Sequence, residues 1–410
     1  MSNFKRVSVE IDALKDVVIE WQRRLVSIKA LGPENGGEGE LYKAQYIKKV
    51  LGELGFVDLQ EINAPDSRVP GGYRPNILAK KYGENRKKTL WILAHMDVVP
   101  AGDLSLWQSD PFELKVNGDK LIGRGTEDNH QGLVCALAMV RALQQANVEP
   151  KRNIGLAIVA DEESGSKFGL DYVLKNSKDF NQDDLIIVPD AGDPEGKTIE
   201  ISEKSIMWVK FHIKGKQCHA STPQFGHNAH KAAAHLVVEL ESLHDLYPKQ
   251  DSMYDTPWST FEPTKKQANV PNINTIPGED IFFIDCRILP EYPIQDVEQA
   301  LEAVCRRVEK EFKVEIEISY PQKEQAAPPT SRQSPVVYAL STAIQAVKKT
   351  TPQIIGIGGG TVAAFFRRAG FSAAVWGTIA DVCHQPNEYS LISNTLIDAK
   401  ILAYIALQDD

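Results

Sequence analysis

Histidine and carboxylate residues stand directly after several strongly apolar runs of this chain. The runs WILA, LAIVA and LIIVP lead into His95 and Asp97, into Glu162 and Glu163, and into Asp190. Imidazole and carboxylate groups are common protein ligands of divalent metals, and carboxylates also act as acids and bases in catalysis. One such carboxylate alone is usually a solvated charge. Its recurrence after successive apolar runs favours a metal site.

The elements that position these residues alternate along the chain. Apolar runs typical of buried strands occur at 89–94, 153–160 and 185–189. The spacing of apolar residues predicts helices at 11–30, 41–54 and 132–146. This alternation indicates an α/β domain with a largely parallel sheet. Ligands of open α/β sheets collect at the carboxyl ends of the strands, which is where the polar residues stand.

The pattern changes after residue 203. We expect strands and helices of a small α+β unit at 205–215, 228–247, 280–289, 294–312 and 314–320. Its strands alternate in polarity, so one sheet face should be exposed and the other covered by the helices. Helix–strand alternation resumes after the polar, proline-rich segment 322–335, with helices expected at 335–349, 361–369 and 394–407.

These breaks predict three consecutive parts. Residues 1–203 form the first part of an α/β catalytic domain, 204–321 an inserted α+β domain, and 322–410 the second part of the catalytic domain. A chain of 410 residues is too long for one ordinary core, which agrees with this division.

The composition narrows the function classes. The formal net charge is −9, which disfavours nucleic acid and anionic membranes as partners but leaves room for a small anionic substrate. No signal peptide and no membrane-spanning run is recognisable. The five cysteines lack metal-ligand spacing and are interpreted as free thiols, so we expect a cytoplasmic protein.

Seven segments occur in an order that carries a family resemblance. They are LAHMDVVPAGDLSLWQSDPFEL, IGRGTEDNHQG, ADEESGS, VPDAG, KGKQCHASTPQFGHNA, DCRILP and HQPNEY. Together they resemble the two-metal family of aminoacylase, succinyl-diaminopimelate desuccinylase and glutamate carboxypeptidase. The resemblance implies a zinc-peptidase-like α/β catalytic domain with an inserted dimerisation or lid domain. A homodimer is therefore expected.

The resemblance also implies a set of five metal ligands. His95 and Asp190 would hold one divalent ion, Glu163 and His384 a second, and Asp128 would bridge the two. Zinc is the expected metal, with cobalt or manganese as alternatives, because it accepts imidazole and carboxylate ligands and keeps a position open for water.

Two further residues beside these ligands would act in the reaction. Asp97 would accept the other ring N–H of His95 and fix its tautomer. Glu162 is the expected general base, which takes a proton as metal-bound hydroxide attacks the amide carbon and passes it to the departing amine. The alternative for the Glu162–Glu163 pair is a solvated loop.

Two residues of the inserted domain have both a functional and a structural interpretation. The resemblance makes His219 an oxyanion stabiliser that reaches a neighbouring subunit, and the alternative is a turn histidine with local hydrogen bonds. It makes Arg287 a ligand of the substrate carboxylate, and the alternative is a salt bridge with Asp285 or Glu291. Asn274 is a further candidate for a polar contact with substrate.

The glycine-rich segment IGIGGGTVAAFF is expected to approach the substrate through Gly359 and Gly360. No GK[ST] follows, so a phosphate-binding loop is disfavoured. The chain departs from the family pattern here, because many members have an acidic residue at the positions of Thr361 to Ala363. It departs again after Asp128, where Asn-His-Gln-Gly replaces a shorter motif with lysine.

Hydrolysis of an amide bond in a small, carboxylate-bearing N-acyl amino acid is the leading functional hypothesis, with deacylation of the succinyl-diaminopimelate type as one named example. A dipeptidase or carboxypeptidase would share the same chemistry. A non-catalytic metal-binding protein on the same fold is the rival of another class. The presence of Glu162 and of all five ligands disfavours it.

Overall fold

The computed structural model describes residues 2–408. The chain divides into two compact units, and the second comprises Ser202–Pro329 and Ile355–Ala364. The division differs from the predicted one at 202–203, 322–329 and 355–364, which group with the second unit. One reason is that strand β16 (Glu315–Glu324) continues past residue 321. Another is that the main chain of residues 356 and 357 bonds to Met253 and Lys204.

The first unit contains a mixed sheet in the order β1-β4-β8-β5-β9-β18-β10-β17. In that order the strands are Asp58–Glu61, Ile77–Lys81, Arg152–Val159, Asn85–His95, Leu185–Val188, Ala373–Val375, Thr198–Glu203 and Gln353–Ile357. The neighbours β8, β5, β9 and β18 are parallel, whereas β1, β4 and β10 pair in antiparallel fashion. The predicted parallel sheet is therefore correct for the centre only, because apolar runs report burial and not strand direction.

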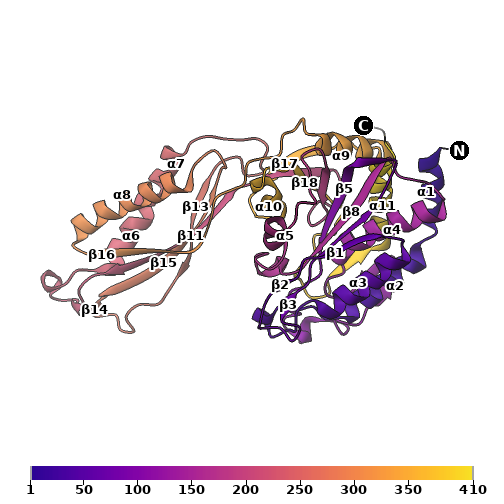
Figure 1. Cartoon of the computed structure of the whole chain (residues 1–410). Helices are drawn as coiled ribbons and strands as arrows, with labels where there is room; N and C mark the ends of the chain where they lie inside the picture. Colours follow the sequence, from indigo (N-terminus) through magenta and orange to yellow (C-terminus); the bar gives the residue numbers. More distant parts are fainter. Residues whose placement is uncertain (1, 409–410) are drawn as a thin grey trace. The chain divides into compact units, whose positions relative to one another are not determined.

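Helices cover this sheet. Their bounds are α1 Asn3–Asp12, α2 Lys15–Ser27, α3 Leu41–Glu53, α4 His130–Gln145, α5 Leu170–Asn176, α9 Pro335–Lys348, α10 Ala363–Arg368 and α11 Ile392–Ala406. Helices α1, α2, α4 and α11 pack against one another, and α4 lies against β5 (Figure 1). Among the described residues, no helix is long and apolar enough to cross a membrane.

Short strand pairs complete the first unit. Strands β2 (Ala64–Pro65) and β3 (Tyr73–Arg74) form one pair, and β6 (Lys115–Asn117), β7 (Lys120–Ile122) and β19 (Tyr389–Leu391) form a three-stranded sheet. The pairing of β19 with β7 brings the C-terminal region beside residues 120–122.

The second unit is an antiparallel sheet with helices on one face. The strand order of the sheet is β13-β15-β11-β16, with β13 at Thr260–Lys266, β15 at Glu279–Ile288 and β11 at Ser205–Lys214. The unit also contains the strand pair β12 (Cys218–His219) and β14 (Thr275–Ile276). Its helices are α6 Ala229–Leu240, α7 Ser242–Leu246 and α8 Ile294–Phe312. Burial alternates along β11 and β15, and α6 packs on these two strands while α8 packs on β16. Phe211 stacks on Phe282 in this core, with ring centres 4.9 Å apart.

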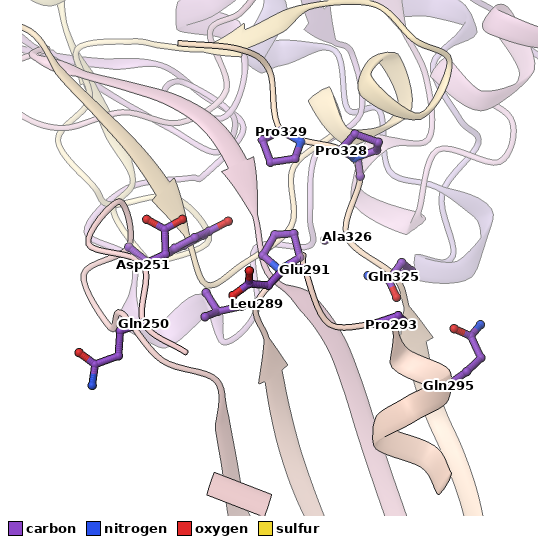
Figure 2. A pocket seen from close by; sticks show the side chains of 13 residues that line it. Gln250, Asp251, Leu289, Glu291, Pro293, Gln295, Gln325, Ala326, Pro328 and Pro329 are labelled. Carbon is purple, nitrogen blue, oxygen red and sulfur yellow. The ribbon is translucent and has the colours of Figure 1, made fainter. Parts of the chain in front are cut away.

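A cavity of about 780 Å³ opens on the second unit (Figure 2). Four prolines and several polar side chains line it, among them Pro293, Pro328, Asp251 and Glu291. None of the residues predicted to do chemistry lines this cavity.

Two predicted helices are each divided in the structure. The helix expected at 11–30 is α1 and α2, which meet near Leu14, and the one expected at 228–247 is α6 and α7, which meet at Glu241. Buried Ile11, Leu14 and Val18 keep helical spacing across the first break. A continuous apolar stripe therefore leaves no sign of such a break in the sequence.

Strand β13 was not predicted. It is an edge strand with Pro263 in its middle, and all but its first two residues are exposed. Edge strands need no alternating apolar pattern, since one side of the strand is open to solvent. The linker expected from residue 322 begins only after β16 ends at Glu324.

Candidate active site

His95 is the last residue of the buried strand β5, and its side chain is 1% exposed. Its Nδ1 lies 3.0 Å from the carbonyl oxygen of Asp97, so this nitrogen carries the proton and donates. The other nitrogen, Nε2, lies 2.8 Å from Asp128 Oδ1 and 3.3 Å from Asp190 Oδ1. A lone pair that faces carboxylate oxygens, which only accept, requires a proton or a cation between them.

The two oxygens of Asp128 face different imidazoles. Oδ1 faces His95, whereas Oδ2 lies 3.0 Å from Nε2 of His384. His384 Nε2 is also 3.1 Å from Glu163 Oε2. Asp128 therefore lies between two ligand groups, one around His95 and one around His384.

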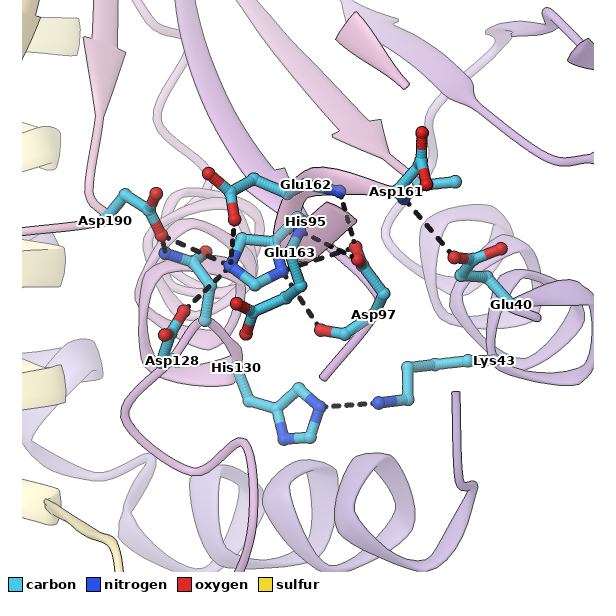
Figure 3. Close-up of polar contacts among 12 residues, drawn as sticks. Glu40, Lys43, His95, Asp97, Asp128, His130, Asp161, Glu162, Glu163 and Asp190 are labelled. Atoms are coloured by element: carbon cyan, nitrogen blue, oxygen red, sulfur yellow. Dashed lines mark hydrogen bonds and ion pairs between the residues drawn. The ribbon is translucent and has the colours of Figure 1, made fainter. Parts of the chain in front are cut away.

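Glu162 and Glu163 form a short turn where β8 ends. Asp161 has a left-handed backbone (φ 61°), and the 3₁₀ turn η3 follows at Glu162–Ser164. This turn directs both glutamates toward the same cluster, with Glu162 Oε2 4.0 Å from His95 Nε2 (Figure 3). In a regular strand the two side chains would instead point to opposite faces.

Asp97 contacts both this turn and the imidazole of His95. Its Oδ1 and Oδ2 accept the N–H groups of Glu162 (3.1 Å) and Glu163 (3.0 Å). The carboxylate is 3.5 Å from His95 Nδ1, farther than the carbonyl oxygen of the same residue. The backbone of Asp97 thus makes the closer contact with the imidazole, and its side chain orients the two glutamates.

Asn129 connects the segments of Asp128 and Asp190. Its amide nitrogen donates to the carbonyl oxygen of Pro189 (2.8 Å) and to Asp190 Oδ1 (2.5 Å). The residue is buried. It was not predicted, although it is the direct neighbour of a predicted ligand.

The donor set fits divalent cations. His95 forms one possible metal-holding group with Glu162 and Asp190 and another with Asp128 and Glu163. Within the described part of the chain, the buried Oε1 of Glu163 has no hydrogen-bond partner. Buried carboxylates that face one another are costly unless a positive charge lies among them. The two imidazoles and the carboxylates provide nitrogen and oxygen ligands of the kind that zinc accepts.

The charges of the cluster shift the pKa values of its side chains. Burial, together with the charge of Asp190, raises the pKa of Glu162 well above its ordinary value. Hydrogen bonds to Asp128 and Glu163 raise the pKa of His384 to about 10. Burial would lower the pKa of His95, but Asp190 and Asp128 outweigh it and raise that pKa. The carboxylates thus attract a positive charge to this site.

Glu388 ties the C-terminal region to the turn that carries Asp128. Its carboxylate accepts from Arg124 Nη1 (2.7 Å) and from the N–H groups of Gly125, Glu127 and Asp128 (2.8 to 3.0 Å). Glu388 is fully buried. It completes the motif HQPNE after His384, and this position could have identified it from the sequence.

Lys43 and His130 form a second unpredicted contact behind the cluster. Lys43 Nζ lies 2.8 Å from His130 Nε2, and both residues are buried (Figure 3). Burial lowers the pKa of Lys43 to about 7. Gly125 has a left-handed backbone, and a side chain there would meet the His130 ring at 2.8 Å. His130 belongs to neither possible metal-holding group of the described residues.

His219 and Asn274 belong to the second unit and lie beside each other. His219 is on β12 and pairs with Thr275 of β14, and the N–H of Ala220 donates to the carbonyl of Asn274 (2.9 Å). Nδ1 of His219 accepts from the N–H of Ser221 (3.1 Å), so the proton of the neutral ring is on Nε2. That nitrogen can act as a donor.

Arg287 forms a salt bridge with Asp285, which was the structural alternative to its predicted role in binding substrate. Nε and Nη2 donate to the two oxygens of Asp285 at 2.7 and 3.1 Å, and Nη1 donates to the carbonyl of Gly358 (2.9 Å). Glu291, the other suggested partner, binds Lys249 instead. Arg287 therefore connects β15 to the glycine-rich segment.

The glycine-rich segment is not crowded. A Cβ at Gly359 or Gly360 would meet other atoms only at 3.8 and 3.6 Å. Thr361, which stands where many family members have an acidic residue, contacts the carboxylate of Glu203 through its hydroxyl (2.5 Å). A carboxylate from β10 therefore adjoins the position where the sequence lacks one.

A model of the peptidase family M20/M25/M40 matches residues 91–408. The chain belongs to this family. The fold, the family resemblance and the enzyme class predicted from the sequence are thereby confirmed: the protein is a metallohydrolase of the M20 family that acts on amide or peptide bonds.

Relatives agree with this membership, and a solved structure shares the fold. A metallohydrolase of Methanococcus maripaludis is 41% identical over 95% of this chain and 98% of its own length. A succinyl-diaminopimelate desuccinylase of Rickettsia bellii is 25% identical over 91% and 92%. Human carnosine dipeptidase 1 has the same fold, with a TM-score of 0.73, 20% identity and coverage of 99% and 98%.

Proposed function

We propose that this M20-family chain hydrolyses the amide bond of a small N-acyl amino acid that carries a free carboxylate. The observation that carries the proposal is the arrangement of Asp128, whose two oxygens face the imidazoles of His95 and His384. The desuccinylases among the relatives support deacylation, with a substrate of the succinyl-diaminopimelate type as the first candidate.

Two divalent ions, with zinc as the first choice, fit the donor set. His95, Asp128 and Asp190 would hold one, and Asp128, Glu163 and His384 the other. Ions bound there supply Lewis acidity and lower the pKa of a water molecule at the site.

Glu162 is the residue of this cluster that can move a proton. Its raised pKa suits a group that takes a proton from the attacking water at Oε2. The same oxygen then gives the proton to the departing amine nitrogen. Asp97 keeps Glu162 in position through its hydrogen bond to the main-chain N–H.

Residues of the second unit would bind the substrate. We assign to His219 the stabilisation of the oxyanion in the active site of a neighbouring subunit, which requires a homodimer. Arg287 would bind the substrate carboxylate, and Asn274, Gly359 and Gly360 would contribute polar contacts. Since Nδ1 of His219 accepts, Nε2 carries the proton and can donate, which supports the first role. The guanidinium of Arg287 would bind substrate with the N–H groups that Asp285 and Gly358 leave free.

A substrate panel tests the proposal. N-succinyl and N-acetyl amino acids and dipeptides are assayed with zinc, cobalt and manganese, and metal content is measured alongside. We expect metal-dependent hydrolysis of a carboxylate-bearing N-acyl amino acid. Faster cleavage of dipeptides would favour the dipeptidase alternative, and a fully metal-loaded protein that cleaves none of them would favour the non-catalytic one.

The variant Glu162→Gln tests the mechanism. Since general acid and base catalysis typically contributes about 10²- to 10⁴-fold, kcat should fall by that factor while metal content stays unchanged. Glu149→Gln, on the exposed surface, is the matched control. A Glu162→Gln variant with normal kcat would contradict the assigned role.

A further inference from the structure

The turn of Glu162 and Glu163 begins at a residue in an unfavourable conformation. Asp161 is not glycine, yet its backbone is left-handed, which the surrounding structure must maintain. Its carbonyl oxygen accepts from the N–H of Ser166 (2.6 Å) and its Oδ2 from the N–H of Phe168 (2.9 Å). The conformation of Asp161 sets the direction of the main chain at Glu162 and Glu163.

Two side chains from distant segments hold Asp161. Arg74, on β3, donates through Nη1 to Asp161 Oδ1 (3.3 Å) and through Nε to Glu40 Oε2 (2.6 Å). Its Nη2 also contacts Glu40. Glu40, which directly precedes α3, accepts the main-chain N–H of Asp161 at Oε1 (3.3 Å, Figure 3). Arg74 and Glu40 thus contact both the side chain and the main chain of Asp161.

This contact is enclosed in the protein. The side chains of Arg74 and Glu40 are 0% exposed and that of Asp161 is 2% exposed. Arg74 is also 3.8 Å from Asp66. A buried guanidinium among carboxylates needs well-oriented hydrogen bonds to offset its desolvation, and this one makes several. The arrangement therefore has a defined geometry, in contrast to an exposed ion pair.

We propose that Arg74 and Glu40 are positioning residues for the reaction, which hold Asp161 so that Glu162 and Glu163 point into the cluster of His95. This rests on the function proposed above. Asp97 holds the N–H groups of Glu162 and Glu163, and Arg74 with Glu40 holds the residue before them. Two separate sets of contacts thus hold the start of the turn. A displacement of about 1 Å in a catalytic group can cost on the order of 10²-fold in rate.

Arg74→Lys tests the proposal. Lysine keeps the positive charge but lacks the planar guanidinium. It therefore cannot bind both carboxylate oxygens of Glu40 and the carboxylate of Asp161 at the same time. We expect kcat to fall about 10- to 100-fold at saturating metal, with KM changed less than threefold. Arg68→Lys is the matched control, because Arg68 lies nearby and binds Asp66 and Glu34 but not Asp161.

A second readout needs no substrate. Glu163 is a proposed ligand, so the visible absorption spectrum of the cobalt-loaded protein should change in Arg74→Lys and stay unchanged in Arg68→Lys. Should Arg74→Lys fail to fold, Glu40→Gln decides by the same two measurements, since it removes a charge and little volume. Wild-type kcat together with a wild-type cobalt spectrum would overturn the proposal.

Failure of the proposed function would look different. In that case the wild-type protein hydrolyses no member of the substrate panel, and the cobalt spectra alone decide whether Arg74 and Glu40 position Glu163. A spectrum that changes in Arg74→Lys supports the positioning role even then, whereas an unchanged spectrum rejects it.

Discussion

The side chains of the cluster depend on a few neighbours that hold them in place. Asp97 is one of them, because one carboxylate accepts two consecutive main-chain N–H groups of the glutamate turn. Its carbonyl oxygen also accepts from His95 and fixes which nitrogen of the ring faces the carboxylates. A single residue thereby orients an imidazole and two carboxylates.

At the residue scale, Asp97→Asn should weaken metal binding. The amide keeps one acceptor oxygen, but its NH₂ group faces the second main-chain N–H, so the turn loses a hydrogen bond. Loss of a residue that orients metal ligands typically costs about 10- to 100-fold in metal affinity. Cobalt titration measures this, with the exposed Asp183→Asn as control. An unchanged affinity would contradict the role given to Asp97.

At the scale of elements, the site depends on contacts between segments that lie far apart in the sequence. The turn before α4 carries Asp128, and the segment between β18 and β19 carries His384. Glu388 connects them, since one buried carboxylate binds Arg124 and three main-chain N–H groups of that turn. The pairing of β19 with β7 brings the two segments together.

Glu388→Gln should destabilise the fold. The substitution leaves the buried guanidinium of Arg124 without its charged partner and places an NH₂ group against N–H donors. Breaking a buried ion pair in this way typically costs about 3–5 kcal/mol of unfolding free energy. Urea denaturation measures the loss, and the exposed Glu53→Gln should show almost none. A Glu388→Gln variant as stable as the wild type would refute the connection.

At the scale of the whole molecule, the proposed metal site should couple metal binding to folding. The proposed ligands come from segments between residues 95 and 384, so the complete set exists only in the folded chain. A ligand that binds the native state alone at 100 times its Kd stabilises that state by about 2.7 kcal/mol. Cations bound at the site would also offset the repulsion among the carboxylates of Asp128, Glu163 and Asp190.

Removal of metal should therefore lower the thermal unfolding midpoint. We expect a chelator to decrease the midpoint and zinc to restore it. His384→Ala, which removes one proposed ligand, should show a smaller difference between the two conditions. Scanning calorimetry measures both proteins, and equal midpoints with and without chelator in the wild type would show that no stabilising metal binds.

The sequence by itself was sufficient to predict the fold class, the family and the polar site residues that follow the apolar strands. Burial on both faces makes residues 90–94 of β5, 154–159 of β8 and 185–188 of β9 apolar throughout, and the polar residues that follow these runs are therefore conspicuous. These are local features, since they depend on the periodicity and neighbours of one short segment. The helix breaks at Leu14 and Glu241 could not be predicted in this way, because the apolar spacing continues across them.

The tertiary structure alone decided which groups meet. No pattern around Glu40 or Arg74 indicates that they hold Asp161, and none around Lys43 indicates that it contacts His130. It also decided strand direction at the sheet edges and which oxygen of Asp128 faces which imidazole. The physical reason is that apolar periodicity reports burial within one element, whereas the partner of a buried charge depends on how distant segments pack together.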